Sequence, residues 1–418
     1  MMSSTKVKKN IMLTYVDLFA GAGGLSEGFI RNGFEPIIHV EMNVDACYTL
    51  KTRLAYHYLK NNNQLDIYAS YLKAEISRAD LYENLPIDLL DSILNLKIDD
   101  ANLNYIYKQI DKNLKLRKFK KVDLLIGGPP CQAYSLIGRH GIDWDNDERV
   151  KLYKLYGKIL AKYKPSMFVF ENVPGIISAN KGEYFNDLRS YYDKLGYNVD
   201  YQILKAEEFG VLQSRRRVII IGSLKSKKLV YPDFPKMIEK YTTADVFHDL
   251  EVLKPGDSIS NGKYKKSASE YQKKYHVREN FDFYTQHITR PHNTNDLAIY
   301  KIVQDKWNNE KHRLKYNDLP KKLRTQNNIS SFLDRFKVVD LNGLSHTLVA
   351  HIAKDGHYYI HPTQTRSISV REAARLQSFP DNYFFEGSRT AAFTQIGNAV
   401  PPLMSQVLAK TIKEILIN

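Results

Sequence analysis

The sequence is poor in cysteine and contains no long apolar run. Its 418 residues include two cysteines, Cys47 and Cys131, too few for a disulfide framework or a zinc site of the usual spacing. A membrane-spanning helix needs about 18 or more consecutive apolar residues, and no such stretch occurs. The first residues, MMSSTKVKKN, show no signal-peptide pattern. These absences favour a protein of the reducing cytoplasm with no membrane partner.

Acidic residues are also scarce relative to basic ones. The chain has 61 Lys and Arg against 46 Asp and Glu, a net charge of +15, and the excess is concentrated between about residues 225 and 344. Such a balance favours a polyanionic partner, most often nucleic acid, although many basic proteins have none. The length of the chain predicts two domains.

The first half of the chain alternates apolar strands with helices. We expect strands over residues 14–20, 35–42, 122–128, 167–173 and 218–223. Short apolar strands separated by helices predict an α/β fold with a doubly wound, mostly parallel sheet covered on both faces.

The strand–helix alternation is interrupted twice. Within a first domain of residues 1–224, the polar residues 61–120 are interpreted as a helical insertion. Residues 225–344 are predicted to form a smaller, irregular and basic domain, and residues 345–418 return to the first domain.

Glycines occupy the turn between the first strand and the first helix. The segment DLFAGAGGLSEGF places Gly21, Gly23 and Gly24 there, which allows a tight turn and close approach of backbone to a ligand. A dinucleotide fingerprint would have a third glycine where Ser26 stands. Glu41 ends the next strand, the place of an acid that binds ribose hydroxyls. The pattern predicts an adenosine-containing cofactor and argues against a nicotinamide-dependent dehydrogenase.

A thiol, a carboxylate and two guanidinium groups are predicted at neighbouring strand ends. Cys131 lies in GGPPCQAYS, Glu171 in FENV, and Arg215 and Arg217 in QSRRR. Ligands of open α/β sheets bind at such strand ends. The set supplies a nucleophile, an acid and holders for an anion or carbonyl, and the arginines would lower the thiol pKa. A core cysteine, a capping carboxylate and a solvated arginine face would each explain one residue; their convergence favours a catalytic site.

These motifs, in this order, resemble those of the DNA cytosine-5 methyltransferases of the bacterial restriction–modification type. The likeness covers most of the chain and rests on DLFAGAGGLS, HVEMN, GGPPCQAYS, FENV, QSRRR, VREAARLQSFPD and QIGNAVPP. It implies a Rossmann-like fold dependent on S-adenosyl-L-methionine (SAM), with a target-recognition domain over residues 225–344. The implied reaction transfers the methyl group to carbon 5 of a flipped-out cytosine in double-stranded DNA and leaves S-adenosyl-L-homocysteine.

The resemblance also implies roles for individual residues. Cys131 would attack carbon 6 of the cytosine, Glu171 would hold and protonate nitrogen 3, and Arg215 and Arg217 would fix the base or the loop. The implied cofactor contacts are Phe19, Gly21, Gly23, Gly24, Leu25, Glu41, Met42, Pro130, Leu152, Asn398 and Val400. Gln132, Ser135, Ile137 and Gln213 are expected on the DNA side, in or near a loop that closes over the base.

Several points stay open at the level of sequence. The family usually has an Asp before the nucleophile strand that bonds the adenine amine, and Asp99 and Asp100 are the candidates here. His351, His357 and His361 are interpreted as surface or packing histidines, so no metal is expected. We expect a monomer, and a cognate restriction endonuclease acting separately is a candidate partner.

Two alternative functions remain within the same fold. An RNA cytosine methyltransferase is disfavoured by the length of the basic region, which exceeds 100 residues. A catalytically silent DNA-binding relative would be expected to lack Cys131, Glu171 or Arg217, and all three are present. The DNA sequence recognised does not follow from this chain.

Overall fold

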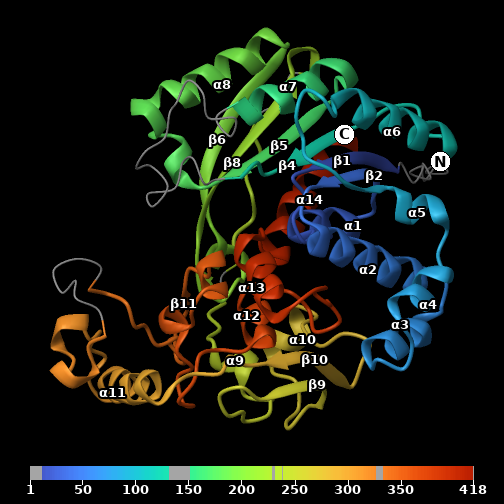
Figure 1. The fold of residues 1–418 in the computed structure, drawn as a ribbon. Coiled ribbons are helices and arrows are strands. Elements are labelled where there is room, and N and C mark those ends of the chain that lie inside the picture. Colours follow the sequence, from blue (N-terminus) through green and yellow to red (C-terminus); the bar gives the residue numbers. More distant parts are fainter. Residues whose placement is uncertain (1–11, 131–150, 228–230, 238, 326–332, 418) are drawn as a thin grey trace, which may run out of the picture.

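A seven-stranded sheet forms the centre of the computed structural model, which describes residues 12–130, 151–227, 231–237, 239–325 and 333–417 (Figure 1). The strand order is β3-β2-β1-β4-β5-β8-β6. The first five strands in this order run parallel, whereas β8 is antiparallel to both of its neighbours. The strands are β1 (Leu13–Leu18), β2 (Phe34–Glu41), β3 (Ile93–Asn95), β4 (Leu124–Gly127), β5 (Met167–Asn172), β6 (Tyr197–Lys205) and β8 (Arg216–Leu224).

Helices cover both faces of the sheet, as the apolar strands predicted. In Figure 1, α6 (Leu103–Leu116), α7 (Leu152–Tyr163) and α8 (Glu183–Lys194) lie above it, and α1 (Gly24–Arg31), α2 (Val44–Asn61) and α14 (Pro402–Ile417) lie below. All six residues of β1 are buried. Tyr15 packs into the core on one face and Val16 into the core on the other, because successive strand residues point to opposite faces. The doubly wound α/β fold is confirmed.

The segment 61–120 differs from the helical insertion that its polarity indicated. Its first part does lie outside the sheet, as α3 (Leu65–Leu72), α4 (Arg78–Glu83) and α5 (Ile87–Asp91). Its second part belongs to the central fold, because β3 pairs with β2 and α6 packs Leu103, Ile106 and Ile110 onto the sheet. A strand of three residues leaves too short a pattern to recognise, and polar residues cover the outer side of α6.

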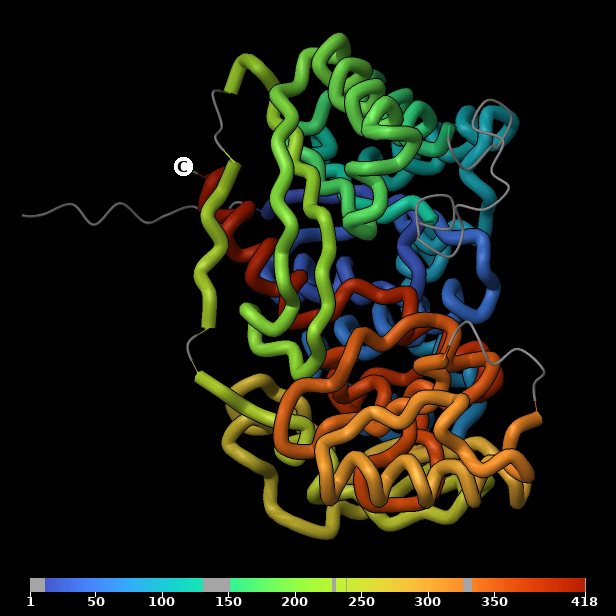
Figure 2. Tube along the Cα trace, turned by 90° about the vertical axis from the view of Figure 1, so that its left-hand side faces the viewer, coloured from blue at the N-terminus to red at the C-terminus, as the bar shows by residue number. Residues whose placement is uncertain are grey.

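A lower lobe, residues 239–325 and 333–385, lies beneath the sheet domain in Figures 1 and 2. Its elements are short apart from one helix: α9 (Ala244–Phe247), β9 (Ser258–Lys263), α10 (Glu270–Lys274), β10 (Phe283–Ile288), α11 (Thr294–Glu310), β11 (Ser345–His346) and α12 (Val370–Leu376). β9 and β10 form an antiparallel ladder. β11 pairs with β7 (Gln213–Ser214), and α13 (Arg389–Asn398) leads back to α14.

The lower lobe shares its main hydrophobic core with the sheet domain. Phe247, Tyr271 and Phe379 belong to the same buried cluster as Phe29 of α1 and Met404 of α14. The region around α11 has a cluster of its own. No described helix combines the length and apolar character that crossing a membrane requires.

A fully buried ion network anchors α12 in the lower lobe. The Arg375 guanidinium contacts Asp249 Oδ1 at 2.6 Å and Asp381 Oδ2 at 2.6 Å. The Arg375 and Asp249 side chains are fully buried, and that of Asp381 is 2% exposed. Burial alone would raise the pKa of Asp381, but the adjacent arginine lowers it below its usual value. Asp381 therefore depends mainly on Arg375 for its charged state.

We expect Arg375→Met to lower the free energy of unfolding by about 3–5 kcal/mol, because it removes the shortest ion pairs of two buried carboxylates and leaves them only the longer contacts with Arg278 and Arg371. Denaturant unfolding would measure the loss. Lys306→Met is the matched control: it removes a surface ion pair with Glu310 in α11, which is worth less than about 0.5 kcal/mol. Equal losses in the two variants would contradict a stabilising role for the network.

Candidate active site

The turn after β1 is built around hydrogen bonds to Glu41. The Gly21 N–H donates to Glu41 Oε2 at 2.9 Å, and the Asn43 N–H donates to Oε1 at 2.7 Å. Phe19, just before the turn, has a φ of 58°, in the left-handed region that a bulky residue rarely adopts. Such backbone strain concentrates at ligand sites. A Cβ on Gly21 would meet nothing within 4 Å, so this side of the turn is open.

Gly24 is required by close packing against the C-terminal segment. A Cβ on Gly24 would lie 2.2 Å from the Val400 carbonyl oxygen, and one on Gly23 would lie 2.8 Å from Leu50. Leu25 is 6% exposed in the first turn of α1, whereas Asn398, the last residue of α13, is exposed. The glycine turn and the last motif thus form one wall, although they are more than 370 residues apart.

Asn95 lies at the end of β3, directly opposite Glu41 in the parallel register. Its side-chain amide donates to the Met42 carbonyl at 2.9 Å, which leaves its side-chain oxygen as an acceptor at the strand ends. The Met42 side chain beside it is 65% exposed. The sequence pattern did not indicate Asn95, because it did not predict β3 as a strand.

Asp99 and Asp100 are engaged away from Glu41. Asp100 forms an exposed ion pair with Lys158, and Asp99 Oδ1 accepts from the Asn102 N–H at 3.0 Å. The structure therefore favours Asn95 over either aspartate as the polar side chain nearest the Glu41 edge.

Asp17 in β1 is a second residue that the sequence analysis passed over. It is 1% exposed, and its Oδ2 atom has no hydrogen-bond partner among the described residues. Burial and the nearby Glu41 carboxylate raise the pKa of Asp17 well above its usual value. Two carboxylates within electrostatic reach of each other beside an open turn suit a ligand that carries positive charge.

Glu171 and Arg217 form a partly buried ion pair at the end of β5. Arg217 Nε lies 2.8 Å from Glu171 Oε1, and the two side chains are 11% and 12% exposed. Burial raises the pKa of Glu171, while Arg217 and Arg215 oppose the shift. The protonated form of Glu171 therefore persists to a higher pH than that of a free glutamate, as a proton donor requires.

The segment before Cys131 is held against Glu171. A Cβ on Gly128 would lie 2.7 Å from Glu171 Oε2, and the Asn172 side-chain amide donates to the Pro129 carbonyl at 3.1 Å. Pro130 is partly exposed at the end of this described stretch. Cys131, Gln132, Ser135 and Ile137 lie outside the described residues.

Arg215 is buried among backbone carbonyls. It is 0% exposed and donates to the carbonyls of Leu348 at 2.5 Å and Ala399 at 2.9 Å. Its guanidinium thus joins β7 to the returning chain and to the last motif. Arg215 also opposes, electrostatically, the rise that burial causes in the pKa of Glu171.

Gln213 is also fully buried, in contrast to the expected place on the DNA side. Its side-chain oxygen accepts from the Leu348 N–H at 2.7 Å, and its amide donates to the Leu376 carbonyl at 3.1 Å. The physical reason is the pairing of β7 with β11, which covers this residue. Leu152, the first residue of α7, is 9% exposed and packs into the same hydrophobic core as Val16 of β1.

The three histidines have separate partners. His361 lies 3.5 Å from Glu372 and His351 lies 3.2 Å from Asp355, carboxylates that the sequence did not reveal as neighbours. His357 hydrogen-bonds to Tyr300 at 2.8 Å. The described residues contain no group of three or more metal-ligating side chains.

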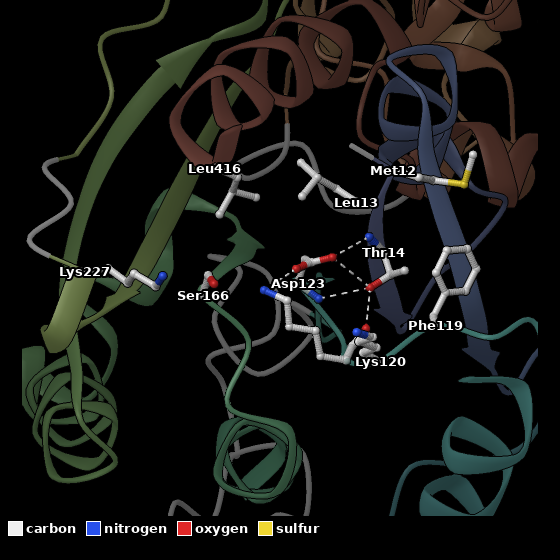
Figure 3. A pocket seen from close by; sticks show the side chains of 10 residues that line it. Met12, Leu13, Thr14, Phe119, Lys120, Asp123, Ser166, Lys227 and Leu416 are labelled. Atoms are coloured by element: carbon white, nitrogen blue, oxygen red, sulfur yellow. Dashed lines mark hydrogen bonds and ion pairs between the residues drawn. The ribbon is translucent and has the colours of Figure 1, made fainter. Parts of the chain in front are cut away.

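A cavity of about 270 Å³ lies at the opposite end of the sheet (Figure 3). Thr14 and Asp123 line it, at the start of β1 and just before β4, together with Lys227 and Leu416. It is therefore separate from the strand ends that carry Glu41 and Glu171.

A family model for the C-5 cytosine-specific DNA methylases matches residues 13–81 and 95–414. The chain belongs to this family. The resemblance that the motifs indicated is thereby confirmed.

Two bacterial relatives of this methylase match nearly end to end. The type II methyltransferase M.Bpa9945I of Bacillus paralicheniformis is 41% identical over 439 residues, covering 96% of this chain and 98% of the relative. The type II methyltransferase M.AgeI of Thalassovita gelatinovora is 30% identical, with coverage of 95% and 98%.

A solved structure of a putative DNA modification methyltransferase encoded within a prophage of E. coli shares the fold. Its TM-score is 0.64 at 24% identity, and the match covers 97% of this chain and all of that one. At 24% identity, this likeness supports the fold of the methylase alone.

We expect Gly128→Ala to reduce methyl transfer by the methylase at least tenfold, because the new methyl group would collide with the Glu171 carboxylate. Binding of SAM, measured by calorimetry, should stay within about twofold, since the Glu41 edge is untouched. A variant with full transfer activity would show that Glu171 is free to move aside.

Proposed function

We propose that this methylase modifies carbon 5 of one cytosine within a short specific DNA sequence, as the modification enzyme of a restriction–modification system. The observation that carries the proposal is the Glu171–Arg217 pair packed against the segment that leads into Cys131. The nearly full-length likeness to bacterial type II methyltransferases supports the biological setting. The enzyme is proposed to act as a monomer in the cytoplasm, with a cognate endonuclease acting separately.

The glycine turn fits SAM. Glu41 would accept from the ribose hydroxyls, the exposed Met42 would cover the adenine ring, and Asn95 would accept from the adenine amine. The Asp17 oxygen that has no hydrogen-bond partner among the described residues suits a cofactor that carries sulfonium and ammonium charges. Phe19, Gly21, Gly23, Gly24, Leu25, Pro130, Leu152, Asn398 and Val400 are the further contacts proposed. When bound, SAM supplies the electrophilic methyl group.

The reaction of the base depends on three side chains of the methylase. The target cytosine leaves the helix at a cost of a few kcal/mol, on the order of one base pair's stacking and pairing. The Cys131 thiolate bonds to carbon 6 while Glu171, held by Arg217, protonates nitrogen 3, so that the adduct is an enamine rather than a carbanion. After carbon 5 has accepted the methyl group, its proton passes to water, the thiolate leaves carbon 6 and the proton on nitrogen 3 returns to Glu171, which restores both Cys131 and Glu171. Gln132, Ser135 and Ile137 are proposed to close over the base.

Recognition of the DNA sequence is proposed for residues 225–344. This region holds most of the lower lobe and the densest excess of basic residues. Side chains at base edges would supply the specificity, and lysines and arginines at phosphates would supply much of the affinity.

Incubation with labelled SAM is expected to place methyl groups on unmodified duplex DNA, and Cys131→Ser should reduce transfer by at least a thousandfold, because serine is a far poorer nucleophile at neutral pH. Bisulfite sequencing of the product would identify the cytosine. Transfer to RNA but not to duplex DNA would favour the RNA methyltransferase instead, and full activity of the serine variant would refute the nucleophile.

We expect Glu41→Ala to weaken SAM binding by at least tenfold, because it removes the ribose acceptor and releases the Gly21 turn. Asn95→Ala should weaken binding by a smaller factor. Asp100→Ala is the matched control, since Asp100 pairs with Lys158 at the surface. Calorimetry on the purified proteins would rank the three, and a larger loss in the Asp100 variant would reverse the assignment of the adenine contact.

A further inference from the structure

A segment directly after α11 carries a high density of positive charge. We call residues 311–324 the basic segment: it has six Lys and Arg residues and one Asp. Lys311, Arg313, Lys315, Lys321 and Lys322 are exposed. Like-charged side chains at this density repel one another, so a polyanion would stabilise the arrangement.

The lysines of the neighbouring helix α11 form ion pairs, and Lys311 of the basic segment lies 3.7 Å from Asp340, whereas three other basic residues of the segment have no such partner among the described residues. Lys301 pairs with Asp305 at 2.7 Å and Lys306 pairs with Glu310 at 2.8 Å. Within the described part of the chain, Arg313, Lys321 and Lys322 have no acidic partner within ion-pair distance. Their charges are therefore available to a ligand.

The side chains of Asp318 and Arg324 in the basic segment form hydrogen bonds with backbone groups. Asp318 Oδ2 accepts from the Lys315 N–H at 3.1 Å. Arg324 donates to the carbonyls of Leu319 at 2.9 Å and Asn317 at 2.6 Å. These bonds fix the turns on which the exposed charges stand.

Apolar residues anchor the basic segment to α11. Leu314, Tyr316 and Leu319 are at most 5% exposed and share a cluster with Ile299 and Tyr300 of the helix. The backbone of the segment is thus held in place, and its basic side chains keep a defined spacing. Pre-ordered charges lose less conformational entropy on binding than a flexible basic tail.

A chain of direct contacts links the basic segment to the strand that precedes Arg217. Tyr316 stacks on Phe336, and Phe336 contacts His357. His346 of β11 hydrogen-bonds to the Tyr358 carbonyl next to His357, and β11 pairs with β7. In Figure 2 the helix α11 crosses the front of the lower lobe, and α8, which follows β5, lies above it.

We propose that the basic segment binds phosphates of duplex DNA beside the target site and positions the lower lobe without reading bases. The proposal rests on the proposed function, because it takes the polyanion to be the DNA substrate. Lys and Arg contacts to phosphate fix the register of a protein on the duplex but carry no sequence information. Base reading then belongs to other parts of residues 225–344.

The test compares DNA affinity across salt concentrations for the intact protein and for the triple variant Arg313→Gln, Lys321→Gln, Lys322→Gln. The probe is a duplex of random sequence, so the result does not depend on knowing the methylated site. Each lost phosphate contact should reduce the slope of log affinity against log salt by about 1, so the triple variant should lose about 3. SAM binding should not change, which shows that the variant is folded.

The matched control removes three exposed lysines at the other end of the molecule, with Lys108→Gln, Lys115→Gln and Lys120→Gln in and after α6. Its salt slope should equal that of the intact protein. An equal fall in both variants would show a general charge effect, and an unchanged slope in the triple variant would show that the segment does not touch DNA; either result overturns the proposal.

Three further outcomes separate this proposal from the proposed function. Once the methylated site is known, the triple variant should lose affinity for specific and random duplexes by the same factor, and loss for the specific duplex alone would mean base reading and refute the proposal. If the intact protein and the triple variant differ in salt slope as expected, but the intact protein transfers no methyl group, the result would refute the proposed function only. Loss of binding to double-stranded RNA alone would refute the phosphate contact with DNA.

Discussion

The contact between Glu171 and Arg217 depends on a reversal of strand direction. β8 runs antiparallel to β5, with Glu171 opposite Ile219, so the beginning of β8 lies beside the end of β5. A parallel β8 would place Arg217 at the other end of the sheet. Burial raises the pKa of the Glu171 carboxyl, and the Arg217 guanidinium limits this rise. The chemistry at the strand ends needs this balance.

Close backbone approach holds the rest of the site together. A side chain on Gly24 would displace Val400, and one on Gly28 would lie 2.3 Å from Ser405, so the close approach of α1 to the C-terminal segment requires glycine at both positions. The Arg215 guanidinium then ties the last motif to the strand that bears Arg217. The strand ends that carry Glu41 and Glu171 are consequently joined through packed segments.

The positive charge of the lower lobe lies in two places, the buried core and the surface. Arg366, Arg371 and Arg375 are 0% exposed and bind carboxylates or carbonyls; planar guanidinium groups suit such fixed, multiple hydrogen bonds. The lysines of the basic segment stay at the surface, where a flexible ammonium group suits phosphate. The buried carboxylates of Glu372, Asp249 and Asp381 offset these three guanidinium charges, so the buried arginines add nothing to the net positive charge of the chain.

Local patterns in the sequence were enough for the strand–helix alternation, the glycine turn with Glu41, and the family, because these depend on neighbours along the chain. The roles of Gln213 and Arg215, the place of β3, and the exposed acceptor of Asn95 could not be obtained in that way. Each depends on a segment far away in the sequence: β11 covers Gln213, the carbonyls near residues 348 and 399 surround Arg215, and β2 gives β3 its partner. Burial and hydrogen bonding are properties of packed surfaces, and those surfaces exist only once the chain has folded.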